Sequence, residues 1–168
     1  MAPIPVYSSD NFSLFISQKE NTTSIKMQLH ISILYTSDFP HTLFFLKEKL
    51  PGVLNTKCFN ERNIPFHHEV TQTEIGHLFE HVLLEYLCRE KLSRGNKSIV
   101  FNGLTNWNWH QDPKGVFHIT IDVGLEDKEI FENALEKSIF LIESLIREGE
   151  VQKNNLEETN SLSLPTTS

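Results

Sequence analysis

Cysteine is scarce in this sequence, which has two cysteines, Cys58 and Cys88, among its 168 residues. Two cysteines cannot form the disulfide framework of a small secreted domain, and they fit a reducing compartment. Long apolar runs are also missing, since no stretch approaches the roughly 18 apolar residues that are needed to cross a bilayer. The first residues contain neither a basic start nor an apolar block, so no secretory signal is expected. We therefore expect a cytoplasmic protein with no membrane contact.

Positive charge is in short supply as well. The chain has 15 Lys and Arg against 22 Asp and Glu, which makes a formal net charge of −7. A nucleic-acid binder needs a basic face that displaces counterions from phosphates, so nucleic acid is not an expected partner. Apolar residues make up 39% of the chain, slightly less than in a typical globular protein. The polar composition of the C-terminal stretch accounts for this. We expect one α+β domain over residues 1–149 and a disordered tail over residues 150–168.

Alternating apolar and polar residues predict the strands. The clearest alternation covers residues 25–35, and residues 12–16 are its expected partner across a turn at 20–23. A second strong alternation covers residues 116–123, after the turn Asp112-Pro113-Lys114-Gly115. Residues 98–101 are a shorter candidate strand. Strands that are apolar on one face only are typical of a sheet that helices cover on that face.

Three helices are predicted from apolar residues at helical spacing and from the signals at their ends. The first follows Asp38 and ends before Pro51, the second covers residues 73–92, and the third covers residues 126–147. Together with the strands they indicate an α+β fold, with a mainly antiparallel sheet covered on one face by about three helices.

The second helix carries a polar stripe opposite its apolar face. Leu84 and Cys88 interrupt the polar residues of that stripe, so we expect the stripe to be partly buried in a cleft. Its members are Glu74, His77, Glu80, His81, Leu84, Glu85 and Cys88.

Within this stripe, His77-Leu78-Phe79-Glu80-His81 is an H-x-x-E-H pattern, which is typical of inverted zinc hydrolases. Residues i and i+4 lie one turn apart on one helix face, so His77 and His81 can converge on one zinc ion. Glu80 lies beside them, where a carboxylate can take a proton from an activated water instead of binding the metal. We predict His77 and His81 as metal ligands and Glu80 as the general base. The alternative is a histidine pair at the edge of the core that binds no metal.

The segment 76–85, which contains this pattern, resembles the helix in the N-terminal domain of cyanophycin synthetase. The resemblance extends upstream to Leu50-Pro51-Gly52-Val53 and Cys58 and downstream to Gly115-Val116-Phe117 and the last helix, so it covers about residues 46–146. It implies a small metallopeptidase-like domain, which in that family is described as cutting the aspartate–arginine polymer cyanophycin to make primers. No phosphate-binding glycine-rich loop follows here, so we expect a free-standing relative.

The resemblance also bears on the third metal ligand, since a catalytic zinc needs three protein ligands. Glu85 matches the family motif and lies on the polar stripe, so it is the first candidate. Because it lies roughly 12 Å along the helix from His77, the alternative is that it orients His81 by accepting a hydrogen bond. Glu126 and Glu143 are more distant candidates. The resemblance leads us to expect an Arg-rich stretch at residues 103–110, but this chain does not have one. If these residues contact the substrate, the substrate differs from that of the family.

Other residues that can bind metals or ligands are interpreted as structural. His67, His68 and Glu69 lie in a loop before a helix, and adjacent side chains point apart. Trp107 and Trp109 are expected to pack in the core, with stacking on guanidinium groups as the alternative. The remaining members of this group, expected at exposed or small buried positions, are His30, His110, His118, Cys58 and Cys88.

The leading hypothesis is a hydrolase, dependent on zinc, that cleaves a peptide or isopeptide bond in a peptide-like substrate such as an aspartate–arginine polymer. The alternative is a non-catalytic binding module for an arginine-bearing polymer or a partner protein. The metal content of the purified protein discriminates between them, because only the hydrolase requires a bound ion. The sequence indicates no oligomeric state.

Overall fold

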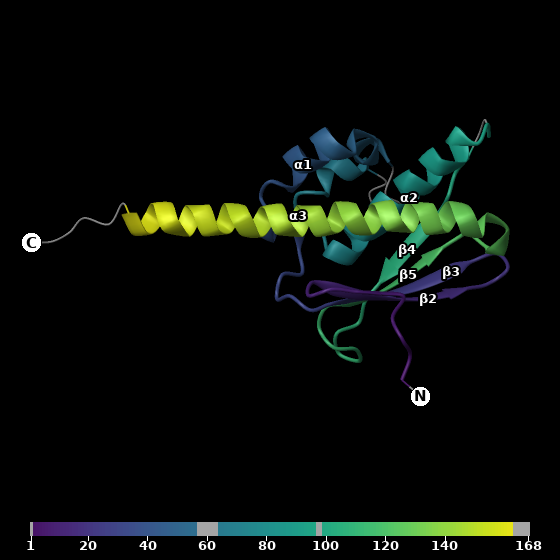
Figure 1. The fold of residues 1–168 in the computed structure, drawn as a ribbon, viewed down its shortest axis with the longest axis horizontal. Coiled ribbons are helices and arrows are strands. Elements are labelled where there is room, and N and C mark those ends of the chain that lie inside the picture. The colour runs from purple at the N-terminus through teal and green to yellow at the C-terminus, as the bar shows by residue number, and fades with distance from the viewer. Residues whose placement is uncertain (1, 57–63, 97–98, 163–168) are drawn as a thin grey trace, which may run out of the picture.

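A computed structural model of the chain describes residues 2–56, 64–96 and 99–162. These residues contain a five-stranded antiparallel sheet and three α helices, which confirms the predicted α+β fold (Figure 1). The strand order is β1-β2-β3-β5-β4, so β4 lies at one edge of the sheet. The strands are β1 (Tyr7–Ser8), β2 (Phe12–Gln18), β3 (Thr23–Leu29), β4 (Gly103–Asn106) and β5 (Val116–Ile121).

The sheet has one buried and one exposed face, as the alternation predicted. In β5, Phe117, Ile119 and Ile121 are buried while His118 and Thr120 are exposed. The three helices lie on the same side of the sheet and cover its apolar face (Figure 1). The core therefore lies between the sheet and the helices.

Strand β3 ends at Leu29, six residues earlier than the sequence predicted. The pairing ends there because Leu29 is opposite Phe12, the first residue of β2. Ile31 and Ile33 still pack on the core outside the sheet, so their alternation reports burial and not strand pairing. The candidate strand at 98–101 is not observed over residues 99–101, and Ser98 lies outside the described residues.

The helices are α1 (Thr42–Lys49), α2 (Ile75–Ser93) and α3 (Lys128–Leu162). Two short 3₁₀ helices, η2 (Pro51–Asn55) and η3 (Phe66–His68), lie between α1 and α2 in the chain and contact each other. Among the described residues, no helix is both long enough and apolar enough to span a membrane.

Helix α3 continues well past Arg147, where the sequence predicted its end. Residues 150–162, predicted as the start of a disordered tail, are helical and exposed. Figure 1 shows this part of α3 extending beyond the body of the protein. The prediction failed because it used apolar periodicity, which reports the burial of a helix face and not helicity itself. Residues 163–168 lie outside the described part of the chain.

Glu143 on α3 anchors the N-terminal segment. Its carboxylate accepts hydrogen bonds from the Tyr7 hydroxyl at 2.9 Å, the Ser9 hydroxyl at 2.6 Å and the Asn11 amide at 2.7 Å. These contacts tie the first strands to the last helix, although the residues are more than 130 positions apart. Glu143 therefore has a structural role in the fold.

Candidate metal centre

Helix α2 carries the H-x-x-E-H pattern and is held firmly by its apolar side. Leu78, Phe79 and Val82 are completely buried. Gly76 allows a close approach to β5, because a Cβ atom there would overlap the Phe117 ring. This packing turns the opposite side of the helix, with the polar stripe, toward β4 and the 3₁₀ helices.

The structure brings three of the predicted site residues together. His77, Glu80 and His81 each offer a ligand atom within 4.8 Å of the others. The Nε2 atoms of the two histidines are 3.1 Å apart. Two nitrogen ligands of one tetrahedral zinc ion, each about 2.05 Å from it, are about 3.3 Å apart, so the observed spacing suits a shared metal.

Two threonine hydroxyls lie within hydrogen-bond distance of the Nδ1 atoms of the two rings. Thr56 donates its hydroxyl hydrogen to the Val53 carbonyl at 2.6 Å, so its oxygen accepts from His81 Nδ1–H at 3.1 Å. The Thr73 hydroxyl lies 3.2 Å from the Glu74 carboxylate, to which it can donate, and 2.8 Å from His77 Nδ1. With the hydrogen on Nδ1 in both rings, both Nε2 atoms would offer a lone pair to an ion.

The two Nε2 atoms face each other at 3.1 Å, within hydrogen-bond distance, and the tautomers of the rings decide which atom donates. Burial, together with the neighbouring His77, lowers the pKa of His81 to about 3, so the doubly protonated ring is disfavoured. Burial also lowers the pKa of His77, although the carboxylates of Glu69 and Glu74 oppose this. Two neutral imidazoles beside a carboxylate are the kind of donor set that can hold a divalent metal ion.

Phe66 of η3 fixes the orientation of the imidazole rings. Its ring is stacked on His81, with centroids 3.8 Å apart and planes 6° apart. It meets the edge of His77 at a centroid distance of 5.5 Å. Because Phe66 is completely buried, the two rings have little freedom to leave the geometry that brings their Nε2 atoms together.

Glu80 is held between α2 and the edge strand β4. Its carboxylate accepts a hydrogen bond of 2.5 Å from the Thr105 hydroxyl. Gly103 gives it room, because a Cβ atom there would lie 2.7 Å from the second carboxylate oxygen. Burial raises the pKa of the Glu80 carboxyl to about 7, while the Thr105 hydrogen bond acts in the opposite direction. A carboxyl with this pKa can accept and release a proton near neutral pH.

Glu85 is not part of this group of ligand atoms. Its carboxylate pairs with the Arg89 guanidinium at 3.1 Å and lies against Gly52. The helix rise explains this, because Glu85 is eight residues from His77 along the axis. The hydrogen-bond partner of His81 Nδ1 is Thr56 and not Glu85. Neither Glu126 nor Glu143 belongs to the group of ligand atoms that the described residues form.

The remaining residues considered in the sequence lie apart from this group. His67 and His68 are exposed, and their rings lie 3.8 Å from each other, so these adjacent side chains do not point apart as expected. Trp107 and Trp109 both pack against Phe117, as predicted for core aromatics, although Trp107 is 38% exposed. His30, His110 and His118 are exposed and Cys88 is half-buried, while Cys58 lies outside the described residues.

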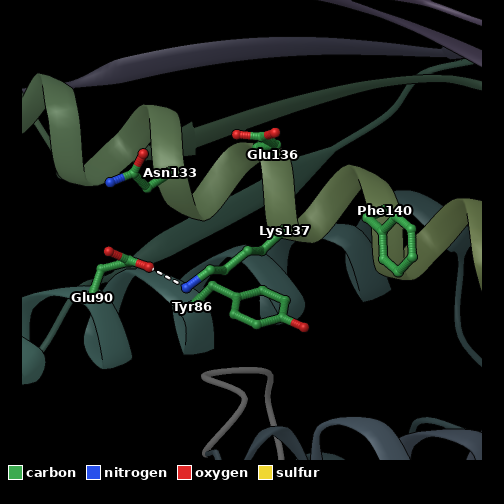
Figure 2. A pocket seen from close by; sticks show the side chains of 6 residues that line it. All are labelled: Tyr86, Glu90, Asn133, Glu136, Lys137 and Phe140. Carbon is green, nitrogen blue, oxygen red and sulfur yellow. Dashed lines mark hydrogen bonds and ion pairs between the residues drawn. The ribbon is translucent and has the colours of Figure 1, made fainter.

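A pocket of about 510 Å³ lies between α2 and α3, and Figure 2 shows the side chains that line it. Lys137 pairs there with Glu90 across the two helices. Tyr86, which lines the pocket, is nine residues from His77 and so projects from the opposite side of α2. The pocket is therefore separate from the candidate metal centre.

Sequence reasoning missed the residues that support the three predicted site residues. Thr73 could have been found, because it is four residues before His77 and so lies one turn away. Thr56, Phe66, Gly103 and Thr105 lie on other elements, and no local period connects them to α2. The stretch 103–110, which departs from the resembled family, contains β4 and thus the contacts to Glu80.

Comparison of the sequence with known protein families and with curated proteins finds no match.

Proposed function

We propose that this protein is a metal-dependent hydrolase of a peptide or isopeptide bond. The observation that carries the proposal is the convergence of two imidazole nitrogens, 3.1 Å apart, beside a buried carboxylate. Two imidazoles and a nearby carboxylate suit zinc, and His77 and His81 would hold it through their Nε2 atoms. Bound zinc lowers the pKa of a water ligand and polarises a carbonyl group, which is the chemistry that such a hydrolysis needs.

Glu80 has the position and the pKa of a general base. Its carboxylate lies in the same group as the two histidines, and Thr105 holds one carboxylate oxygen. It would accept a proton from the attacking water and deliver it to the leaving nitrogen. A pKa of about 7 suits both steps at neutral pH, because the protonated and ionised forms are then both accessible.

The sequence resemblance supports the choice of the first substrate to test, an aspartate–arginine polymer or a short oligomer of it. The scarcity of cysteine supports a place in the reducing cytoplasm, since the chain has two cysteines. The substrate is the part of the proposal that depends on the resemblance, since the metal centre alone does not select the side chains of a polymer.

A non-catalytic module that binds a polymer or a partner protein is the second candidate. This candidate is favoured by the small number of groups available to bind a metal. The described residues bring only two imidazoles and one carboxylate together, and a catalytic zinc needs three protein ligands. If Glu80 binds the ion as the third protein ligand, no general base is left in this group.

The first experiment measures metal content after purification without chelator. We expect about one zinc ion for each chain, and loss of it in the double variant His77→Ala, His81→Ala, because both Nε2 ligands are removed. The matched control is His110→Ala, an exposed histidine that should leave metal content unchanged. A double variant that retains stoichiometric metal would show that the ion is bound elsewhere.

The second experiment compares hydrolysis by the wild type and by Glu80→Gln. The glutamine keeps the size of the side chain but cannot accept the proton, so turnover should fall by about 10²–10⁴-fold while the metal stays bound. The control is Glu85→Gln, which alters a carboxylate outside the group and should keep most of the activity. Equal turnover in metal-loaded Glu80→Gln would exclude the base role. A wild type that binds metal but cleaves no member of a broad peptide panel would favour the binding module.

A further inference from the structure

Strand β4 forms the edge of the sheet beside Glu80. Its hydrogen bonding with β5 shows which peptide groups of β4 point outward. Asp122 N–H donates to the Asn102 carbonyl, and Leu104 and Asn106 are opposite Thr120 and His118. Between two antiparallel strands, hydrogen-bonded residue pairs alternate with pairs that are not hydrogen-bonded. The peptide groups of Leu104 and Asn106 therefore point toward β5, and those of Gly103 and Thr105 point away from it.

The other neighbour of β5 confirms this alternation. Leu29 N–H of β3 donates to the Gly115 carbonyl, so the odd-numbered residues of this segment point toward β3. The even-numbered residues of β5 must then point toward β4. Among the described residues, β5 is the one strand that pairs with β4, so the outer N–H and C=O groups of Gly103 and Thr105 have no strand partner.

The same two residues contact the candidate general base. Thr105 donates its hydroxyl to Glu80, and Gly103 leaves the space that the Glu80 carboxylate fills. They are opposite Ile119 and Ile121, whose side chains face the helices. An unpaired row of backbone donors and acceptors thus runs directly beside the carboxylate and its two histidines.

We propose that an extended peptide binds along the outer edge of β4 as an added strand, pairing with the N–H and C=O groups of Gly103 and Thr105. This inference rests on the proposed function and identifies how its substrate is held. Strand addition presents the carbonyl groups of the peptide at a fixed spacing along the edge, so one of them lies beside Glu80. Trp107 follows β4 and is two residues after Thr105. It is 38% exposed, so its ring offers a surface on which a side chain of the bound peptide would pack.

Charge favours a basic peptide at this edge. The chain carries a net charge of −7. A negatively charged protein attracts lysine or arginine side chains and disfavours acidic ones. The probe is therefore a capped, soluble octapeptide of lysine, threonine and valine residues, which suit both the charge and a strand conformation.

The experiment measures amide hydrogen exchange by NMR in chelator-treated protein, so that the probe is not cleaved. Main-chain pairing supplies the affinity, so the octapeptide should bind at millimolar concentration. It should slow exchange of the Gly103 and Thr105 amides by about tenfold or more. Leu104 and Asn106, already paired with β5, serve as internal controls and should change little. The same octapeptide methylated on every backbone nitrogen should have no effect.

A pair of variants tests the edge from the protein side. Thr105→Pro removes the outward N–H without breaking the bonds to β5, because proline is tolerated at such edge positions. Thr105→Val also loses the hydroxyl but keeps the N–H. We expect Thr105→Val to bind the octapeptide and Thr105→Pro to bind it at least about tenfold more weakly. The Leu104 and Asn106 amides should stay protected in both variants, which shows that the ladder is intact.

The outcomes separate this inference from the proposed function. Binding with the expected exchange pattern supports strand addition even if the protein hydrolyses nothing. Absence of binding, equal binding by the methylated peptide, or equal binding by the two variants overturns it, even if hydrolysis is found. Protection of Gly103 and Thr105 that appears without peptide and rises with protein concentration would mean that two copies pair at this edge, which also overturns it.

Discussion

Thr56 and Thr73 are the hydrogen-bond partners of the Nδ1 atoms of His81 and His77. Each hydroxyl also has another acceptor, so it can receive Nδ1–H from one ring. In the proposed metal centre this leaves both Nε2 atoms unprotonated, which is the state that binds an ion. Such partners of metal ligands raise affinity without touching the ion.

Replacing these threonines tests that role. In Thr56→Val and Thr73→Val, the size of the side chain is nearly kept, but Nδ1–H loses its acceptor and the ring is free to turn or change tautomer. We expect each variant to bind zinc about 10–100-fold more weakly, measured by competition with a chromophoric chelator. Thr120→Val, at an exposed strand position, is the control. Unchanged zinc affinity in the double variant Thr56→Val, Thr73→Val would refute the role.

The contrast between predicted and missed site residues has a simple physical basis. His77, Glu80 and His81 were predicted together because the helical repeat alone places residues i, i+3 and i+4 on one face. The contacts of Thr56 with His81 and of Thr105 with Glu80 each span 25 residues. They depend on how separate elements pack, which local periodicity does not encode.

Among the elements, the interiors were predicted better than the ends. The alternation of β3 and β5 and the apolar face of α2 follow directly from burial on one side. The end of β3 depends on where its partners β2 and β5 begin, so the sequence of β3 itself does not contain it. Strand β4 was missed because four residues at an edge carry too short an alternation to be recognised.

The C-terminal part of α3 leads to a prediction about stability. Residues 150–162 are exposed along their whole length, so they bury little apolar surface on the domain. Removing residues 151–168 should therefore change the free energy of unfolding by no more than about 0.5 kcal/mol, measured by urea denaturation. A larger loss would mean that this segment docks on the domain or on another copy.

Glu143→Ala, on the same helix, is the matched comparison for this truncation. It removes the acceptor of three hydrogen bonds from the N-terminal segment. We expect a loss of about 1–3 kcal/mol in the free energy of unfolding, because donors that are partly buried lose their partner. The single substitution should therefore cost more stability than the removal of 18 residues, counted from 151 to 168.

Across the molecule, the candidate metal centre joins elements that are distant in sequence. Phe66 of η3 packs on both histidines of α2, Thr56 follows η2, and Thr105 of β4 holds Glu80. An ion bound here requires these elements to be assembled, and the unfolded chain does not offer the site. Metal binding should therefore be linked to the stability of the whole fold.

Metal removal tests this linkage. Free zinc at 100 times its dissociation constant should stabilise the protein by about 2.7 kcal/mol relative to the chelated form. Thermal unfolding with and without chelator measures the effect, which should vanish in the His77→Ala, His81→Ala variant. The same stabilisation in that variant would show that zinc acts at another site.

The position of the two tryptophans has a practical consequence. Trp107 and Trp109 are the chain's two tryptophans. They lie just after β4, with rings 6.4 Å apart, and both contact Phe117. The tryptophan fluorescence of the protein, selected by excitation at about 295 nm, therefore comes from the end of the edge strand that contacts Glu80. The natural chain contains its own optical reporter for this edge, and no label needs to be attached to follow its occupancy in solution.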